Sequence, residues 1–238
     1  MTKLFEALTI RDLTVRNRAW VAPMCQYSAE ERDGVPTEWH LVHYGSRATG
    51  GAGLVIVEAT AVSPEGRISP WDTGIWNEEQ EDGWAYIVDF MHSQGAAAGV
   101  QLAHAGRKAS VYREWSGHGT VPVTDGGWQT VSSTNEAFAG YDAPRKLETA
   151  EVSDVVKDFV KAARRAQDAD RGQHRAGTAD RRGDQPVSLS PGLSAAGAHL
   201  GAGAADRGHA GAAAAGLAAG PAVHLQHRHQ PDGGADRH

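Results

Sequence analysis

An abrupt change in amino-acid composition near residue 169 most constrains what this chain can fold into. All of its Trp, Tyr, Phe, Ile, Met, Lys and Glu residues precede residue 170. From residue 170 to 238, Ala and Gly fill 30 of 69 positions, with only five Leu and two Val. Bulky apolar side chains supply most of the free energy that offsets backbone ordering. We therefore predict a folded part over residues 1–168 and a disordered Ala/Gly/Arg/His tail over 169–238.

Charge and cysteine content exclude several classes of protein. The net charge of −6 disfavours a nucleic-acid partner. Cys25 is the single cysteine, which excludes an internal disulfide and indicates a reducing compartment. No signal peptide opens the sequence, and no apolar run approaches the roughly 20 residues of a membrane span. We expect a cytoplasmic protein with no membrane partner.

The first 168 residues alternate between strand and helix patterns. We expect a hairpin over residues 4–15 and then short apolar strands at 19–22, 53–58 and 98–103. Helices are expected over 37–50 and 77–94, capped by Thr37 and Asn77. Strand–helix units in this order predict a parallel α/β sheet with right-handed crossovers.

The last helix and the segment before it complete this pattern. Residues 106–150 are a long polar connection, which in compact domains is usually functional or disordered. Ser153 is the expected cap of a helix whose buried stripe contains Val156, Phe159, Val160 and Ala163. That helix should lead into a fourth strand, but residues 171–175 lack a strand pattern.

Three clusters of polar or sulfur-containing residues follow the three strands. The first strand leads into PMCQY (23–27), the second into EAT (58–60) and the third into QLAHAGRK (101–108). In α/β barrels the carboxyl ends of the strands line the active site. The sequence therefore predicts that these clusters face one pocket.

The segments PMCQYS, HYGSRATGGAGLVIVEATAVSPEGRIS and VQLAHAGRKAS resemble the Old Yellow Enzyme family, and most closely its bacterial, cysteine-containing branch. The resemblance covers about residues 3–168. It implies the N-terminal portion of a (β/α)8 TIM barrel that binds FMN non-covalently. It also implies an ene-reductase, an NAD(P)H oxidoreductase that transfers hydride to an activated C=C bond of a small electrophilic alkene.

The resemblance also assigns roles to individual residues. Those matched to contacts with the isoalloxazine ring are Pro23, Met24, Cys25, Ala59 and Gln101. The Gln101 amide can both donate to and accept from the pyrimidine edge of a flavin. Cys25 would tune the redox potential of the ring through a polarizable contact. Tyr27 matches a tyrosine at the substrate mouth, where its hydroxyl can polarise a carbonyl.

Other interpretations of the same residues are weaker. Without the family context, Cys25 would be an inert buried residue, Gln101 a strand-end amide and Tyr27 a packed turn residue. His40 and His43 lie three residues apart on one helix, but no further ligands complete a metal shell, so we predict no metal site. The His-rich stretch at 224–229 could bind a divalent metal weakly.

The resemblance ends before the segments that complete the family's site. Those segments carry a histidine pair for the substrate oxygen, a proton-donating tyrosine, an arginine beside the reduced flavin, and the phosphate-binding residues. Five further strand–helix units of roughly 30 residues each would also exceed the 69 remaining positions. We expect an incomplete, aggregation-prone barrel with little or no activity.

Three explanations stay open. The composition of the tail is typical of GC-rich codons read out of frame, so we hypothesise a frameshift near codon 169 of an ene-reductase gene. The alternative is a non-enzymatic fragment with a disordered tail. A third is a tail that binds nucleic acid or metal, which would require a strong salt-dependent affinity. The substrate, the choice between NADH and NADPH, and any homo-oligomer of the intact fold are not fixed by the sequence.

Overall fold

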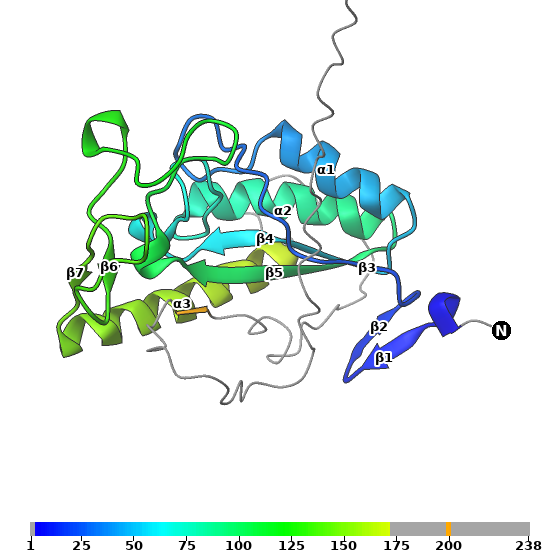
Figure 1. Ribbon diagram of the computed structural model, residues 1–238. Coiled ribbons are helices and arrows are strands. Elements are labelled where there is room, and N and C mark those ends of the chain that lie inside the picture. Colours follow the sequence, from blue (N-terminus) through cyan, green and yellow to red (C-terminus); the bar gives the residue numbers. More distant parts are fainter. Residues whose placement is uncertain (1–2, 172–198, 201–238) are drawn as a thin grey trace, which may run out of the picture. The chain divides into compact units, whose positions relative to one another are not determined.

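A computed structural model of the chain describes residues 3–171 and 199–200 (Figure 1). The chain divides after residue 208 into two units, and every described residue belongs to the first. After an N-terminal hairpin, the main elements in order are β3 (Trp20–Val21), α1 (Glu38–Thr49), β4 (Leu54–Ala61), α2 (Glu78–Ser93), β5 (Ala97–His104), α3 (Thr149–Asp170) and β8 (His199–Leu200). This order confirms the predicted alternation of strands and helices.

The predicted hairpin is present and covers one end of the sheet. Strands β1 (Leu8–Ile10) and β2 (Leu13–Val15) pair antiparallel across a turn at Arg11, whose φ of 53° is left-handed. A short 3-10 helix, Lys3–Phe5, precedes them. Apolar side chains of β2 pack against Leu54 at the start of β4. The hairpin therefore closes the end of the sheet opposite the predicted pocket.

The sheet is parallel, as predicted, with strand order β3-β4-β5-β8. One apolar cluster joins β4 and β5 to all three helices, which places α1, α2 and α3 on the same face of the sheet (Figure 1). Its fully buried members include Tyr44, Val55, Ile87, Met91 and Ala162. This layer holds the carboxyl ends of β4 and β5 in a fixed register.

The predicted N-terminus of the last helix is wrong, and its predicted buried stripe is right in part, since Phe159 and Ala163 pack against the core but Val156 and Val160 do not. Helix α3 begins at Thr149 with Glu148 as its N-cap, so Ser153 lies inside the helix. Its buried residues are Val155, Ala162, Ala166 and Ala169. Val156 and Val160, expected to be buried, are 50% and 47% exposed. The prediction selected the bulkiest side chains, whereas α3 packs closely on α2 and β5 through its alanine face.

The segment after α3 contributes one short strand. The sequence predicts no folded layer beyond residue 168, but α3 continues to Asp170 and β8 pairs with Ala103 and His104 of β5. A two-residue parallel pairing needs backbone groups only, so the absence of bulky side chains does not prevent it. The other tail residues, including the His-rich stretch at 224–229, lie outside the described residues.

The long connection between β5 and α3 is ordered. It contains short 3-10 helices at Gly106–Lys108 and Val123–Asp125, and the two-residue strands β6 (Val131–Ser132) and β7 (Arg145–Lys146).

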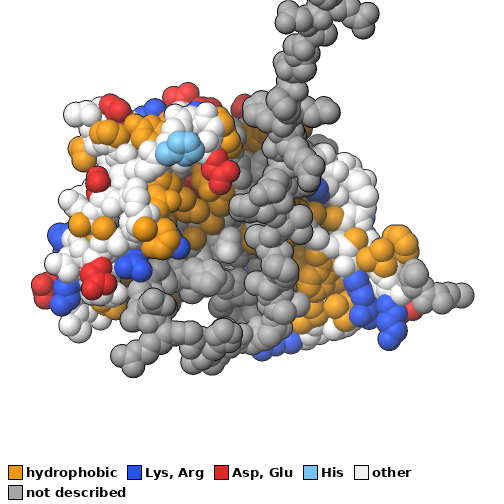
Figure 2. All heavy atoms as spheres, viewed as in Figure 1, with side chains coloured by type: hydrophobic (Ala, Val, Ile, Leu, Met, Phe, Trp, Pro, Cys, Tyr) orange, Lys and Arg blue, Asp and Glu red, His pale blue; other side chains and the backbone are white. Residues whose placement is uncertain are grey.

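Several hydrophobic patches lie on the face of the molecule seen in Figure 2. None of the helices in the described part has the length and apolar character of a membrane span.

Candidate functional site

The structure brings three of the predicted ring-contacting residues together. Ala59 of β4 and Gln101 of β5 are register partners in the parallel sheet. Cys25 follows β3, and its thiol lies beside the Ala59 backbone, which lowers the pKa of the thiol. Pro23 and Met24 precede it in the same segment, and the Met24 side chain is 50% exposed. The carboxyl ends of β3, β4 and β5 therefore converge at one place, as the order of the motifs predicts.

A β-bulge shapes this edge of the sheet. Val57 pairs with Val100 and Ala59 with Gln101, so Glu58 is an extra residue in β4 without a partner in β5. A bulge re-aims the side chains on either side of it and often lies next to a functional site. Here it leaves the small side chain of Ala59 beside Gln101, where a planar ring can approach the backbone.

The Cys25 thiol is neutral near pH 7. Burial and the nearby carboxylates of Asp72 and Glu58 raise its pKa to about 12. The Ala59 backbone and the Tyr27 side chain lower the pKa, but by less. A thiol with this pKa contains almost no thiolate at neutral pH. Cys25 can therefore make polar and polarizable contacts, but it is not a reactive nucleophile.

Tyr27 is held in an uncommon backbone conformation beside Cys25. Its φ of 52° is left-handed, a region that a bulky residue adopts only when its surroundings impose it. Burial, with the nearby groups of Cys25 and Asp72, raises the pKa of its hydroxyl. The hydroxyl therefore stays protonated and can donate a hydrogen bond to an acceptor.

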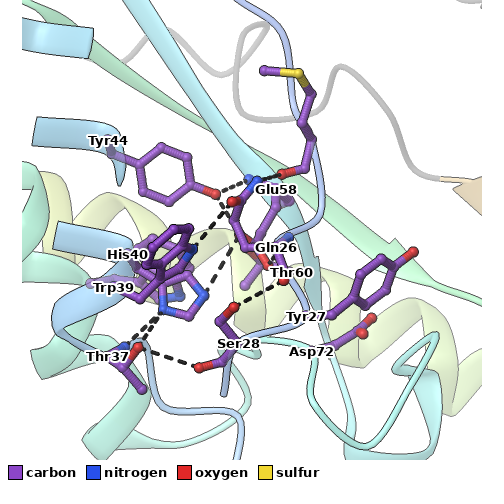
Figure 3. Close-up of polar contacts among 12 residues, drawn as sticks. Gln26, Tyr27, Ser28, Thr37, Trp39, His40, Tyr44, Glu58, Thr60 and Asp72 are labelled. Atoms are coloured by element: carbon purple, nitrogen blue, oxygen red, sulfur yellow. Dashed lines mark hydrogen bonds and ion pairs between the residues drawn. The ribbon is translucent and has the colours of Figure 1, made fainter. Parts of the chain in front are cut away.

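Asp72, which sequence reasoning missed, is a buried carboxyl group next to these residues. Its oxygens accept hydrogen bonds from the Ile68 amide (2.8 Å), the Ser69 amide (3.1 Å) and the Ser69 hydroxyl (2.6 Å). Burial nevertheless raises its pKa to about 7. Figure 3 shows Asp72 on the same side of the 23–28 segment as Tyr27. The only signal in the sequence was an acidic residue within an otherwise apolar stretch.

Gln101 fits the predicted contact with a cofactor. Its side chain is half-buried within the carboxyl-terminal half of β5, and within the described part no hydrogen bond is made by its amide. A partly buried amide that lacks an intramolecular partner is suited to bind a ligand that both donates and accepts. The residues present at this edge of the sheet therefore fit the pyrimidine side of a flavin.

A buried polar network lies on the other side of the 23–28 segment (Figure 3). The Tyr44 hydroxyl donates to Glu58 Oε2 (2.6 Å), and the backbone amide of Gln26 donates to Glu58 Oε1 (3.2 Å). His40, considered above as a metal ligand, instead completes the helix cap: its Nδ1 accepts from the Thr37 amide (2.9 Å). Sequence reasoning missed the network, because its members are far apart in the chain.

The connection after β5 also reaches the site. Arg113 Nη1 donates to the Tyr27 carbonyl (3.2 Å) and to Glu30 Oε1 (2.7 Å). Its guanidinium lies over Trp71, 4.3 Å from the ring centroid, and Trp115 makes an edge contact with the Tyr27 ring at 6.0 Å. The connection therefore supports the left-handed conformation at Tyr27.

The other histidines do not form a metal site in the described part. No group of three His, Cys, Asp or Glu side chains is close enough to hold an ion among residues 3–171. His104 Nδ1 accepts from the Gly106 amide (3.1 Å), and burial lowers the pKa of its ring. Burial likewise lowers the pKa of His43. Both rings are therefore neutral near pH 7.

A parallel sheet with helices on one face is the arrangement of the first strand–helix units of a (β/α)8 barrel. Comparison with known families agrees: residues 3–171 match the NADH:flavin oxidoreductase / NADH oxidase family. The chain belongs to this family, which includes the Old Yellow Enzyme homologues. Members of this family use FMN as the cofactor and NAD(P)H as the electron donor.

Curated relatives include NADPH dehydrogenases from two bacterial genera. That of Listeria welshimeri is 44% identical over 169 residues, covering 71% of this chain and 46% of the relative. That of Bacillus subtilis is 42% identical over 167 residues, covering 70% and 45%. The chain therefore spans about half the length of the curated relatives it matches.

Solved structures give the same result. Morphinone reductase in complex with tetrahydroNAD matches with a TM-score of 0.60 and 31% identity, covering 71% of this chain and 47% of that one. The Old Yellow Enzyme homologue from Zymomonas mobilis matches with a TM-score of 0.59 and 33% identity, covering 71% and 46%. The predicted fold class, the N-terminal portion of a TIM barrel, is therefore confirmed.

Proposed function

We propose that this chain carries the ring-binding half of an FMN-dependent NAD(P)H oxidoreductase that reduces activated C=C bonds of small electrophilic alkenes. The observation that carries this proposal is the convergence of Cys25, Ala59 and Gln101 at the carboxyl ends of three adjacent parallel strands. Ligands bind at this end of the strands in α/β barrels. The family, in which FMN is the cofactor, supports the same assignment.

Each predicted residue has a role that its environment allows. FMN, when bound, accepts hydride from NAD(P)H and delivers it to the alkene. The Gln101 amide would bind the pyrimidine edge of the ring, with Pro23, Met24 and Ala59 along it. The neutral thiol of Cys25 would contact the ring and adjust its potential. The protonated hydroxyl of Tyr27 would donate to the substrate carbonyl and withdraw electron density from the C=C bond.

For the chain as written we propose little or no turnover. The residues that the resemblance assigns to the FMN phosphate and to the substrate oxygen lie beyond the matched part, residues 3–171. An oxyanion anchor and a phosphate anchor supply much of the orientation and binding in such sites. The alternative, a non-enzymatic or frameshifted fragment, would retain the fold of residues 3–171 without the activity. In either case we propose a cytoplasmic location.

FMN binding tests this proposal directly. The full chain is titrated against FMN, and binding is followed by the change in flavin fluorescence. We expect weak binding that Gln101→Leu reduces and that the exposed control Gln129→Leu leaves unchanged. NADPH oxidation with 2-cyclohexenone should not exceed the rate of free FMN. Absence of FMN binding would favour the non-enzymatic alternative, and turnover above free FMN would contradict the proposed inactivity.

The coding DNA tests the origin of the tail. Resequencing codons 160–180 and translating all three frames downstream would show whether another frame continues the barrel. We expect one frame to encode a fourth strand, a histidine pair and a phosphate site. If the written frame is confirmed and no other frame continues, the frameshift hypothesis is wrong.

A further inference from the structure

One buried carboxylate lies beneath the segment that carries Cys25 and Tyr27, and the proposed chemistry does not use it. Glu58 is 1% exposed and occupies the bulge of β4, directly before Ala59 (Figure 3). An ionised group is rarely buried in this way unless its hydrogen bonds are provided. The contacts of Glu58 therefore show which parts of the chain it holds together.

The carboxylate joins three separate parts of the chain. Glu58 Oε1 accepts from the backbone amide of Gln26 at 3.2 Å. Glu58 Oε2 accepts from the Tyr44 hydroxyl of α1 at 2.6 Å. The same hydroxyl accepts from the Glu58 amide at 2.9 Å, which satisfies the backbone donor that the bulge removes from the sheet. The network thus fixes Gln26 to the strand that ends at the site.

Additional bonds hold the same side of the segment. Gln26 Nε2 donates to the Met24 carbonyl (2.8 Å), and Trp39 Nε1 donates to Gln26 Oε1 (3.2 Å). Thr37 Oγ1 donates to the Ser28 carbonyl (3.3 Å). These bonds engage residues 24, 26 and 28. The residues between them, at 25 and 27, are the two whose side chains lie beside each other and shift each other's pKa.

His40 completes the surroundings of the carboxylate. Its Nδ1 accepts a hydrogen bond, so the proton of the neutral ring lies on Nε2, 3.7 Å from Glu58 Oε2. His40 is fully buried, and its Nε2 has no hydrogen-bond partner. The polar groups that face Glu58 are therefore the backbone amide of Gln26, the Tyr44 hydroxyl and the His40 ring, with His43, the Cys25 thiol and Asp72 farther away.

We propose that Glu58 is a positioning residue: its carboxylate fixes the Gln26 backbone and so places Cys25 and Tyr27 relative to Ala59. The description of this place as a flavin site rests on the function proposed above. Glu58 does not contact the ring-binding face itself. It acts through the backbone amide of Gln26, which lies between Cys25 and Tyr27 in the chain, and through its own position next to Ala59 in β4.

Amide hydrogen exchange tests the positioning. In the Glu58→Ala chain, exchange over residues 24–28 should be about tenfold faster than in the wild type, because the Gln26 amide loses its acceptor. Glu58→Gln should preserve slow exchange, because the amide oxygen can still accept from Gln26. The exposed control Glu79→Ala should change nothing. Unchanged exchange over 24–28 in a folded Glu58→Ala chain would overturn the proposal.

A milder variant covers the case in which Glu58→Ala does not fold. Tyr44→Phe retains the carboxylate but removes the donor that orients it, and it should speed exchange over 24–28 about threefold. Exchange in α2 and β5 reports whether the rest of the fold is intact. If residues 24–28 exchange at the wild-type rate in this variant, the proposal is wrong.

Alkylation of the single cysteine gives a readout that a merely structural role would not move. Iodoacetamide labels only Cys25, and its rate against pH reports the thiolate fraction. Glu58→Ala and Glu58→Gln remove the same charge near Cys25, but only Glu58→Ala removes the acceptor of the Gln26 backbone amide, so labelling at pH 9 should be roughly threefold faster in Glu58→Ala than in Glu58→Gln. Equal labelling rates in the two variants would contradict the proposal. Neither hydrogen exchange nor cysteine alkylation requires FMN. Failure of the chain to bind FMN would therefore contradict the proposed function, whereas these two measurements test the positioning role separately.

Discussion

Two irregular segments flank the candidate site, and they are held in different ways. Residues 22–37 lie against the buried network of Glu58, Tyr44 and His40, whose side chains are at most 1% exposed. Residues 105–148 are held by guanidinium groups stacked on aromatic rings and by backbone hydrogen bonds, such as those from the Ala105 and Val111 amides to the Gly66 and Ile68 carbonyls. Removing one partner of a buried carboxylate leaves a charge unpaired, whereas removing one stacking contact leaves the other bonds of the segment in place. Substitutions should therefore cost more in the first segment.

Two stacks join the second segment to the rest of the molecule. Trp71 lies between Arg32 and Arg113, at 4.5 and 4.3 Å from its ring centroid. Arg67 lies between Trp76 and Trp128, at 5.4 and 4.9 Å. The turn that ends at Asp72 lies next to Trp71, so the two segments meet there. Substitutions of Asp72, of Tyr44 in the first segment's network and of Arg113 in the second segment should therefore differ in their effects on stability.

The largest expected effect is a pH dependence due to Asp72. Its pKa is about 7 in the folded chain, raised by burial from 3.8. Between pH 4 and 7 the folded state keeps a proton that the unfolded state loses, so this group lowers the free energy of unfolding as pH rises, by up to about 4 kcal/mol.

Asp72→Asn should remove that decline. The free energy of unfolding, measured by urea denaturation from pH 4 to 8, should fall less with pH in the variant than in the wild type. His43 and His104, whose lowered pKa values give the opposite slope, contribute equally to both chains and cancel in the difference. Parallel curves for the two chains would show that Asp72 titrates normally.

The buried network gives the next effect. Tyr44→Phe leaves the Glu58 amide without an acceptor and its carboxylate without its shortest donor. We expect a loss of about 2–3 kcal/mol in the free energy of unfolding. Tyr86→Phe is the matched control, since Tyr86 is 65% exposed on α2, and it should change stability by less than about 0.5 kcal/mol. Equal effects would mean that the network contributes no stability.

The same contrast explains what the sequence could predict. Apolar strands and capping residues such as Asn77 are local signals, and they predicted the parallel sheet and two helices correctly. Ala59 and Gln101 were assigned through motifs, and the structure makes them register partners. Glu58 was placed in the EAT cluster but given no role, because its partners Gln26 and Tyr44 lie in other parts of the chain. Asp72 was not singled out, because its burial beside Cys25 and Tyr27 depends on the fold.

A smaller effect is expected in the connection. Arg113→Lys retains the charge but loses the planar stack on Trp71 and part of the bonding to Tyr27 and Glu30. We expect a loss of about 1 kcal/mol in stability and faster proteolysis within residues 106–148. The control Arg164→Lys lies on an exposed part of α3. A loss as large as that of Tyr44→Phe would remove the distinction between the two segments.

The smallest effect is expected on the face of α3 that the sequence placed in the core. Val160 is 47% exposed, so Val160→Ala removes little buried surface and gains helix propensity, and stability should change by less than about 0.5 kcal/mol. Ala162, two residues away, is fully buried against the helix–sheet core. The added methyl groups of Ala162→Val should therefore destabilise the fold clearly. If the two variants behaved in the opposite way, the stripe predicted from bulky residues would be right, and α3 would pack through its valines.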